Sequence, residues 1–520
     1  MHLNLNYDYL MTGKADYMIF LFENDFKCVL PELFLTLVTL LMLIFGVIFS
    51  TSKKNNYPLI LYNLCWLSLY TLFFTIILLV NNPIINSVIF YNTLLLDDFT
   101  FFLKFLTLLG VFFSIYISIH YMKQESLNSY EFVVLILLST CSMLFLISSA
   151  DFISMYLAIE MQSLCFYVLA ALKRNSEFST EAGLKYFLLG AFSSGLLLFG
   201  CSMIYGFTGI TNFSDLSKLF LFGTEEISKS LSFLHACELG MIFILVGFLF
   251  KITAAPFHMW APDVYEGSPT SVTAFFSIAP KIAVFSIFLR IFLESFFNFM
   301  WPWQKIVIFC SVTSMIVGSF AAMSQNKIKR LLAFSSIGHV GFLLIGFCCG
   351  TVEGLQSLII YLVIYTLMTI NFFCFILLPL RRFPQRGFIN RLKYTTDLSL
   401  LAKTNPLLAL NLTLTLFSMA GIPPLAGFYS KAFLFFAAIS SSMYFLALIG
   451  VLTSVVSCFY YIRIIKIMYF ESSQSWCSFT NIPRENAITL ALTSLFISFF
   501  IMYPSPIYLL SHKIALIICL

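Results

Sequence analysis

The chain has 520 residues and a net charge of +5, and 60% of its residues are hydrophobic while only 10% are charged. A soluble domain carries about 25% charged residues, so this composition excludes an ordinary soluble protein. Apolar runs of about 20 residues, enough for a helix to cross a bilayer, follow one another along the chain, without the alternating segments of an outer-membrane barrel.

These runs predict an all-α, polytopic membrane protein with about 14 transmembrane helices. An N-terminal extension, 1–28, precedes them and lacks the pattern of a cleavable signal. The predicted helices lie at about 29–49, 58–80, 99–121, 131–149, 152–172, 184–206, 236–256, 270–292, 303–323, 331–349, 355–380, 406–426, 443–468 and 487–509.

The basic residues are unevenly divided between the gaps that separate these helices. Of the 29 Lys and Arg residues, 17 lie in or beside the odd-numbered gaps, and seven lie in or beside the even-numbered gaps and the two ends. Loops on the inner side of a membrane are enriched in Lys and Arg, so both termini are predicted to face the outer side. An odd number of helices would abolish the asymmetry, which supports the count of 14.

Five lysines and one notable glutamate remain inside apolar runs. A charge at the bilayer centre costs about 2.5–3.5 kcal/mol on insertion scales, so such residues usually mark a functional path. Lys104 and Lys185 lie near the ends of their helices, where long side chains can snorkel to the interface. Glu160, Lys251 and Lys281 lie too deep for that interpretation, and Lys431 follows a helix break. The residues are Lys104, Lys185, Lys251, Lys281, Lys431 and Glu160.

Two predicted helices are interrupted by proline and glycine. Pro256 has no N–H and frees a carbonyl group beside Lys251, and GIPPLAGFYSK breaks helix 12 just before Lys431. Unwound backbone at membrane depth survives only inside protein or beside a water-filled cavity, and paired breaks point to an ion or substrate site. The breaks lie five helices apart, so helices 4–8 are predicted to recur, inverted, as helices 9–13. The resulting units are helices 1–3 (29–130), the two repeats (131–292 and 303–468), and helix 14 with the C-terminus (487–520).

A buried lysine suits proton relay, because removal from water favours its neutral amine while a nearby carboxylate favours its charged form. Two charges 4 Å apart interact by about 4 kcal/mol at an effective dielectric near 20, which exceeds the roughly 2.3 kcal/mol for moving a charge across 100 mV. His258 and His339 either extend such a path or form structural hydrogen bonds. The sequence has no nucleotide-binding glycine loop, no C-x-x-C pair and no paired-histidine spacing for haem, and its 13 cysteines are expected to be small buried apolar residues.

Four stretches resemble the antiporter-like membrane subunits of respiratory complex I, the proton-translocating NADH:ubiquinone reductase. The likeness extends from about residue 51 to about residue 503, and its motifs are highly specific. It implies 14 helices in two inverted five-helix repeats, with helices 7 and 12 broken. The stretches are residues 137–206, FLFKITAAPFHMWAPDVYEGSPTSVTAFFSIAPK, NKIKRLLAFSSIGHVGF and GIPPLAGFYSK.

The resemblance also implies roles for individual residues. Glu160 corresponds to the family's glutamate of helix 5, and Lys185 to the lysine paired with it. Lys251 corresponds to the proton-holding lysine of broken helix 7, Lys281 to the connecting lysine of helix 8, and Lys431 to the lysine of broken helix 12. A lysine at this last position, together with an end of the chain soon after helix 14, favours the subunit 2 branch, called subunit N in bacteria.

The expected function is therefore proton translocation through these intramembrane residues, with NADH and ubiquinone acting at other subunits and no cofactor bound by this chain. Its expected partners are lipid and the other subunits of the membrane arm, adjacent antiporter-like subunits included, and no nucleic acid. The expected location is the mitochondrial inner membrane, with both termini in the intermembrane space. The alternatives are a subunit of a multi-subunit cation/proton antiporter, a haem-binding redox subunit and a structural scaffold.

Overall fold

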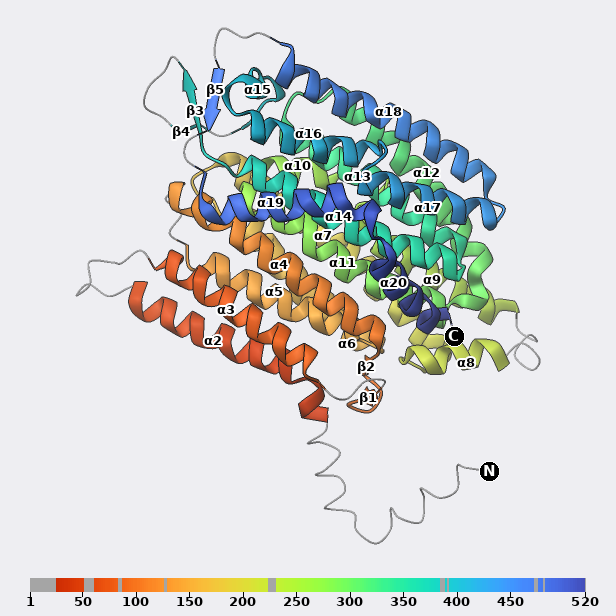
Figure 1. Cartoon of the computed structure of the whole chain (residues 1–520). Coiled ribbons are helices and arrows are strands. Elements are labelled where there is room, and N and C mark those ends of the chain that lie inside the picture. Colours follow the sequence, from red (N-terminus) through yellow and green to blue (C-terminus); the bar gives the residue numbers. More distant parts are fainter. Residues whose placement is uncertain are drawn as a thin grey trace.

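A computed structural model describes residues 25–50, 60–82, 87–125, 129–222, 231–383, 389–390, 392–471, 476–479 and 482–519. The long helices run roughly parallel or antiparallel to one another as one bundle (Figure 1). They are α2 (Leu30–Ser50), α3 (Leu61–Val80), α4 (Asp98–Gln124), α5 (Glu131–Ser148), α6 (Phe152–Ala170), α7 (Glu177–Thr208), α9 (Leu231–Ile252), α11 (Thr270–Arg290), α12 (Met300–Met323), α13 (Ile328–Cys349), α14 (Val352–Ile376), α18 (Tyr444–Tyr469) and α19 (Arg484–Phe499).

Shorter elements complete the described part of the chain. The short helices and helical turns are α8 (Phe213–Phe222), α10 (Trp260–Gly267), η3 (Ile291–Ser295), η4 (Phe297–Phe299), η5 (Thr395–Leu398), α15 (Leu401–Thr404), α16 (Pro406–Ala420), α17 (Ala426–Ser440), η6 (Phe500–Met502) and α20 (Ser505–Cys519). A hairpin joins β1 (Ser87–Ile89) to β2 (Leu94–Leu96), with Val88 opposite Leu95. A second antiparallel sheet has the order β4 (Ile389–Asn390), β3 (Leu380–Phe383), β5 (Trp476–Phe479).

The number of membrane crossings agrees with the sequence prediction. Thirteen helical segments in the described part are long and apolar enough to span a membrane. The fourteenth crossing is formed by α16 and α17, which follow one another across the break at Gly421 (Figure 1). The predicted N-terminal extension, 1–28, lies almost wholly outside the described residues. The inverted relation of the two five-helix units stays a prediction.

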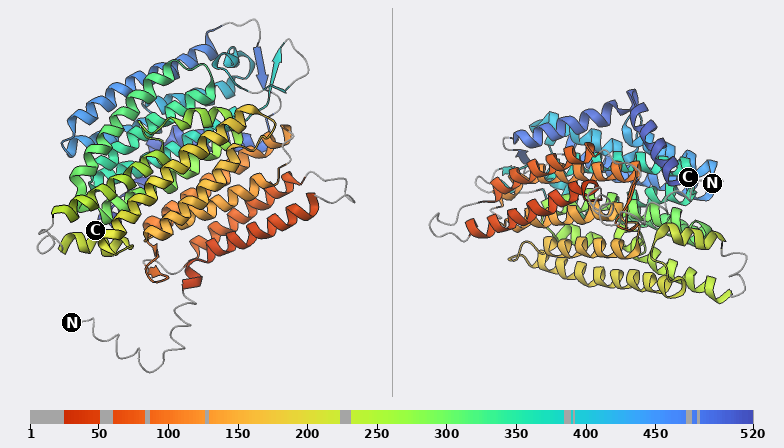
Figure 2. Two further views of the ribbon diagram at one scale, coloured as in Figure 1. Left: turned by 180° about the vertical axis from the view of Figure 1, so that it is seen from behind. Right: turned by 90° about the horizontal axis from the view of Figure 1, so that it is seen from below.

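The connecting segments meet alternately at the two ends of the bundle. At one end, the backbone N–H of Ala150 donates to Thr93 and the side chain of Asn212 donates to Asn92. At the other end, Lys173 pairs with Glu125, and β3, β4 and β5 form their sheet (Figure 2). We call the first the outer end and the second the inner end, following the orientation that the basic residues predict.

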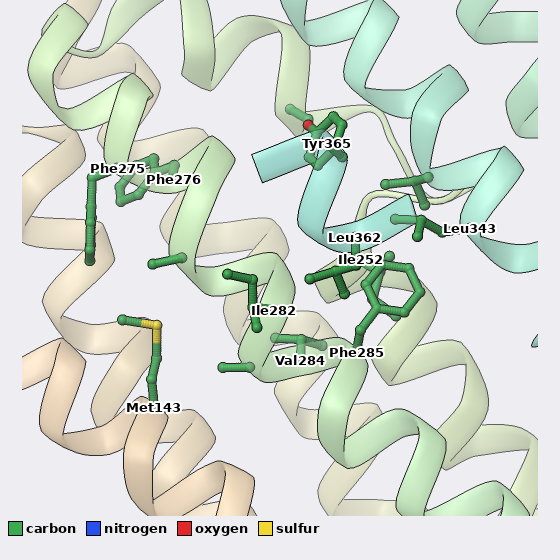
Figure 3. Packing of buried hydrophobic residues seen from close by; sticks show 14 of the residues in the cluster. Met143, Ile252, Phe275, Phe276, Ile282, Val284, Phe285, Leu343, Leu362 and Tyr365 are labelled. Atoms are coloured by element: carbon green, nitrogen blue, oxygen red, sulfur yellow. The ribbon is translucent and has the colours of Figure 1, made fainter. Parts of the chain in front are cut away.

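Three helices form the centre of the bundle. The apolar stretches of α11, α13 and α14 are 94% buried, whereas that of α2 at the edge is only 22% buried. Figure 3 shows Phe285 of α11 beside Ile252, Leu343 and Leu362 from neighbouring helices. A polar side chain on α11 is therefore shielded from lipid on all sides and must find its partners inside the protein.

Two segments differ from the sequence prediction. Residues 257–269 are predicted as a loop, but they contain the helix α10, whose Trp260 stacks on Tyr186 of α7 with ring centroids 4.5 Å apart. Predicted helix 12 stops at residue 426, yet the crossing continues through α17 to Ser440. At its break Gly421 has φ +87°, a left-handed conformation that glycine tolerates and that ends α16 without ending the crossing.

Candidate functional site

Lys251 and Lys281 line the same small cavity in the middle of the bundle. Lys251 lies in the last turn of α9, just before the break, and Lys281 follows Pro280 inside α11. The cavity has a volume of about 30 Å³, enough for one or two water molecules, and Gln162 and Thr253 add polar groups to its wall. The two amines therefore face one space with room for the water that a proton needs to pass between them.

Glu160 lies beside this cavity on α6. Its Oε2 accepts a hydrogen bond of 3.4 Å from Ser163, which also lines the cavity, while Oε1 is buried with no partner in the described part of the chain. Lys251 borders the same cavity, and no ion pair joins it to Glu160 in the described part of the chain. Glu160 is therefore placed to favour the protonated form of Lys251 without forming a contact ion pair with it.

Lys185 does not pair with Glu160, which corrects the sequence prediction. Its Nζ contacts Glu181 at 2.7 Å and Asp263 of α10 at 2.9 Å. The reason is the direction of the two side chains. Helical side chains lean toward the N-terminus of their own helix, which is the outer end for α6 and the inner end for α7. Glu160 and Lys185 consequently point away from each other.

A network of charges at the inner end holds α10 in place. Asp263 also contacts Arg330 of α13 at 3.6 Å, and Glu266 pairs with Lys327 and Arg330. These groups surround a cleft of about 300 Å³. The opposite face of α10 supplies Trp260 and Tyr265 to the wall of the lysine cavity. The short helix thus separates the charged inner cleft from Lys251 and Lys281.

Polar and aromatic side chains in contact continue from Lys281 toward the second half of the bundle. Its Nζ donates to the hydroxyl of Tyr365 on α14 at 2.9 Å. The ring of Tyr365 lies 5.3 Å from that of His339, whose Nδ1 lies 2.6 Å from the hydroxyl of Tyr361 and whose Nε2 lies 3.2 Å from that of Tyr461. An imidazole between two hydroxyl groups can accept a proton on one nitrogen and release one from the other.

Lys431 lies at the second break. From α17 its Nζ donates two hydrogen bonds of 2.9 Å to the carbonyl groups of Met419 and Ala420, at the end of α16. It also lies 5.0 Å from the ring centroid of Phe342, next to His339 on α13. The negative end of the half-helix therefore holds the positive amine, an arrangement expected of a lysine that carries a proton at membrane depth.

Two predicted residues lie apart from this line. His258 is in the break after α9, where its Nδ1 has no partner among the described residues, and it does not line the lysine cavity. The position of Lys104 near a helix end predicted that its side chain snorkels to water. Instead its Nζ forms a buried ion pair of 2.6 Å with Glu32 of α2. Its side chain leans toward the outer end but stops at a carboxylate inside the protein.

The sequence reasoning missed several groups that the structure brings into contact with the predicted ones. The hydroxyls of Tyr365, Tyr361 and Tyr461 were not singled out, since the chain has 25 tyrosines and identity alone separates none of them. Asp263 lies in one of the stretches that resemble the family, but the sequence does not indicate that it pairs with Lys185. Glu32 lies at the very start of a predicted helix, where an acidic residue is ordinary, whereas its partner Lys104 stands inside an apolar run.

Comparison with known proteins places the chain among transporters and respiratory subunits. The family described as NADH:quinone oxidoreductase/Mrp antiporter, TM, matches residues 149–457. NADH-ubiquinone oxidoreductase chain 2 of Marchantia polymorpha is 58% identical over 508 residues, covering 96% of this chain and 100% of that protein. NADH-quinone oxidoreductase subunit N of Pelagibacter ubique is 43% identical, covering 95% of this chain and 100% of that protein.

Solved structures share the architecture. A chain of respiratory complex I from Thermus thermophilus with bound aureothin superposes with a TM-score of 0.75 at 25% identity, covering 93% of this chain and 99% of that one. A chain of the Mrp complex from Dietzia has a TM-score of 0.74 at 19% identity, covering 95% and 97%, which is a likeness of fold alone. The chain therefore belongs to the NADH:quinone oxidoreductase/Mrp antiporter family, on the branch named chain 2 in mitochondria and subunit N in bacteria.

Proposed function

We propose that this chain is the proton-translocating, antiporter-like membrane subunit of a respiratory complex I in the mitochondrial inner membrane. The observation that carries the proposal is the succession of polar groups at mid-bundle, from Glu160 through the cavity of Lys251 and Lys281 to Tyr365 and His339. Burial of this many ionisable groups is too costly for a scaffold. The relatives that match over nearly the whole chain are named as parts of such an enzyme.

In this proposal Lys251 holds the exchangeable proton and Glu160 sets how strongly it is held. Lys281 takes the proton across the water cavity, and Tyr365 and His339 carry it toward Lys431. Lys431 passes it to the far side or to a neighbouring subunit. His258 is left out of the proposed route, because it does not line the cavity. NADH and ubiquinone react elsewhere in the complex, and this chain binds neither.

Lys185 has a different task from the one the resemblance implied. Together with Asp263 and Arg330 it fixes α10, which closes the inner side of the lysine cavity. The other membrane-arm subunits, including adjacent antiporter-like ones, are proposed as its neighbours, and both termini are proposed to face the intermembrane space.

Replacing Lys251 by Ala tests the proposal. In the assembled complex, Lys251→Ala should impair NADH-driven proton pumping, measured with a pH-sensitive dye in vesicles, while assembly is retained. Lys305→Ala is the matched control, since Lys305 is exposed and lies over the ring of Trp301 at the outer end. Wild-type pumping by an assembled Lys251→Ala complex contradicts the assignment. Sodium- or potassium-driven transport without NADH oxidation would instead favour a cation/proton antiporter.

A further inference from the structure

A second set of polar side chains lies in the second half of the bundle, between the inner end and the break that holds Lys431. It belongs to α14, α16 and α19, each of which packs against the other two (Figure 1). We call this set the asparagine seam. Its members are Asn371 and Cys374 of α14, Asn411, Thr415 and Ser418 of α16, and Asn486, Thr489 and Thr493 of α19.

Two contacts join the seam across helices near the inner end. Sγ of Cys374 lies 2.9 Å from the hydroxyl of Thr489 and donates to the backbone carbonyl of Asn486 at 3.4 Å, which connects α14 with α19. Nδ2 of Asn411 donates to the backbone carbonyl of Leu490 at 3.3 Å, which connects α16 with α19. The three helices therefore meet here through polar groups, although they cross the membrane.

A third contact joins the seam near the break. The hydroxyl of Ser418 donates to the sulfur of Met368 on α14 at 3.1 Å. The helices α14 and α16 run in opposite directions, so three residues further inward Asn371 lies at the level of Thr415. Asn411, Thr415 and Ser418 are spaced i, i+4 and i+7, which places them on one face of α16. The polar groups therefore follow one another along the interface of α14 with α16.

The amide groups of the seam lack partners. Asn371 and Asn486 are each only 1% exposed. Nδ2 of Asn371, Oδ1 of Asn411 and both amide atoms of Asn486 are buried and form no hydrogen bond with the residues that the structure describes. Buried polar groups are in the large majority bonded either to protein or to ordered water. Unpaired amides on three adjoining helices therefore indicate bound water.

The hydroxyl groups of the seam add acceptors for that water. The hydroxyl of Thr415 donates to the carbonyl of Leu412 at 2.8 Å, and that of Thr489 donates to the carbonyl of Asn486 at 2.9 Å. A hydroxyl has a single hydrogen, so each of these oxygens still presents lone pairs, while the asparagine nitrogens present hydrogens. A buried water molecule needs two to four polar partners of both kinds, and the seam supplies both.

The seam has one end at the inner surface and the other at the second lysine. Asn486 is the third residue of α19 and follows the exposed Arg484 by two positions. Ser418 directly precedes the two carbonyl groups that accept hydrogen bonds from Nζ of Lys431. Water in the seam would thus lie between bulk solvent at the inner end and the amine of Lys431.

We propose that the asparagine seam binds a line of water molecules and admits protons from the inner end to Lys431. After Lys431 has passed its proton on, its amine is neutral, and a proton that arrives along this water adds to the amine and restores its charge. The inference rests on the proposed function, in which Lys431 is the last lysine of the route. It gives the second half of the bundle an inner supply of protons of its own.

Two threonines of α16 provide a matched test. Thr415→Val and Thr413→Val each replace a hydroxyl by a methyl group, and each hydroxyl donates to a carbonyl of its own helix. The two positions lie about 200° apart around the helix, so only Thr415 is on the face of the seam. In the assembled complex Thr415→Val should lower the protons pumped per NADH, whereas Thr413→Val should pump like the wild type. Wild-type pumping by Thr415→Val, or equal losses in the two variants, overturns the inference.

Asn371→Leu tests the bound water. A map of the intact complex that shows ordered water should contain a water molecule within hydrogen-bond distance of Nδ2 of Asn371, and Asn371→Leu should lose it. Without water, removing an unpaired buried amide would instead raise the midpoint of thermal unfolding. A dry seam in the wild-type map, or such a rise, overturns the inference.

The outcomes separate the seam from the proposed function. If Lys251→Ala abolishes pumping while Thr415→Val pumps normally, the proposed function stands and only the seam is wrong. If Lys251→Ala pumps normally, the proposed function is wrong whatever the seam contains. Should Asn371→Leu fail to assemble, the wild-type map and the two threonine variants still decide the matter.

Discussion

Replacing Tyr365 by Phe removes one oxygen atom from the centre of the bundle and leaves the aromatic ring in place. That oxygen accepts the one hydrogen bond that Nζ of Lys281 donates in the described part of the chain, at 2.9 Å. A hydrogen bond to a charged group contributes about 1.5–3 kcal/mol, and a barrier change of about 1.36 kcal/mol alters a rate tenfold. Without the bond, the state with the proton on Lys281 is higher in energy. We therefore expect Tyr365→Phe to slow transfer through Lys281 by about ten- to a hundredfold.

The assay follows proton uptake and NADH oxidation at the same time in vesicles that contain the assembled complex. Tyr365→Phe should lower the protons pumped per NADH, while NADH oxidation in the presence of an uncoupler stays at the wild-type rate. Tyr444→Phe is the matched control, because Tyr444 is exposed and forms no hydrogen bond with the described residues. A wild-type pumping ratio in Tyr365→Phe refutes the place of this hydroxyl in the route. A double variant with Lys281→Met should pump no less than Lys281→Met alone, since both changes act on one interaction.

Two further substitutions test the helix break and the buried pair. Gly421→Ala should destabilise the protein by about 1–2 kcal/mol, seen as a lower midpoint of thermal unfolding, because a side chain is unfavourable at positive φ and would crowd Lys431. Gly195→Ala, with open space at its Cβ inside α7, should instead be neutral or stabilising by about 0.5–1 kcal/mol, and equal effects at the two sites would contradict the argument. Lys104→Met should cost about 3–5 kcal/mol by leaving Glu32 buried and unpaired. Adding Glu32→Gln should recover most of that loss, and a double variant as unstable as the single one would show that the ion pair is not the cause.

The sequence predicted most of the helices because membrane crossing imposes a length and an apolar composition that few other structures share. It also predicted that lysines lie inside the bundle, and Lys104, Lys281 and Lys431 are buried there. It missed α10, because WAPDVYEG is short, contains Pro262 and two acids, and becomes helical through contacts with Tyr186, Lys185 and Arg330 that lie far away in the chain.

Side-chain partners were the least predictable part of the site. Spacing along the chain shows that Glu160 and Lys185 lie on successive helices, but those helices are antiparallel and their side chains lean to opposite ends. The pairing of Glu32 with Lys104 depends on how the start of α2 approaches α4, which is not its neighbour in the bundle. The tyrosines around His339 give no signal in the sequence, because a tyrosine in an apolar run is as well suited to packing as to hydrogen bonding.

The two halves of the bundle hold their lysines with counter-charges of different kinds. Near Lys251 the counter-charge is a carboxylate, Glu160, which lies on another helix and forms no contact ion pair with the amine in the described part of the chain. The amine of Lys431 is held by the carbonyl groups of Met419 and Ala420, which are permanent dipoles and cannot be neutralised. The attraction on Lys251 thus changes when α6 moves relative to α9, whereas the attraction on Lys431 stays constant. The proton affinity of Lys251 therefore depends on the spacing of two helices, whereas that of Lys431 is fixed within its own crossing.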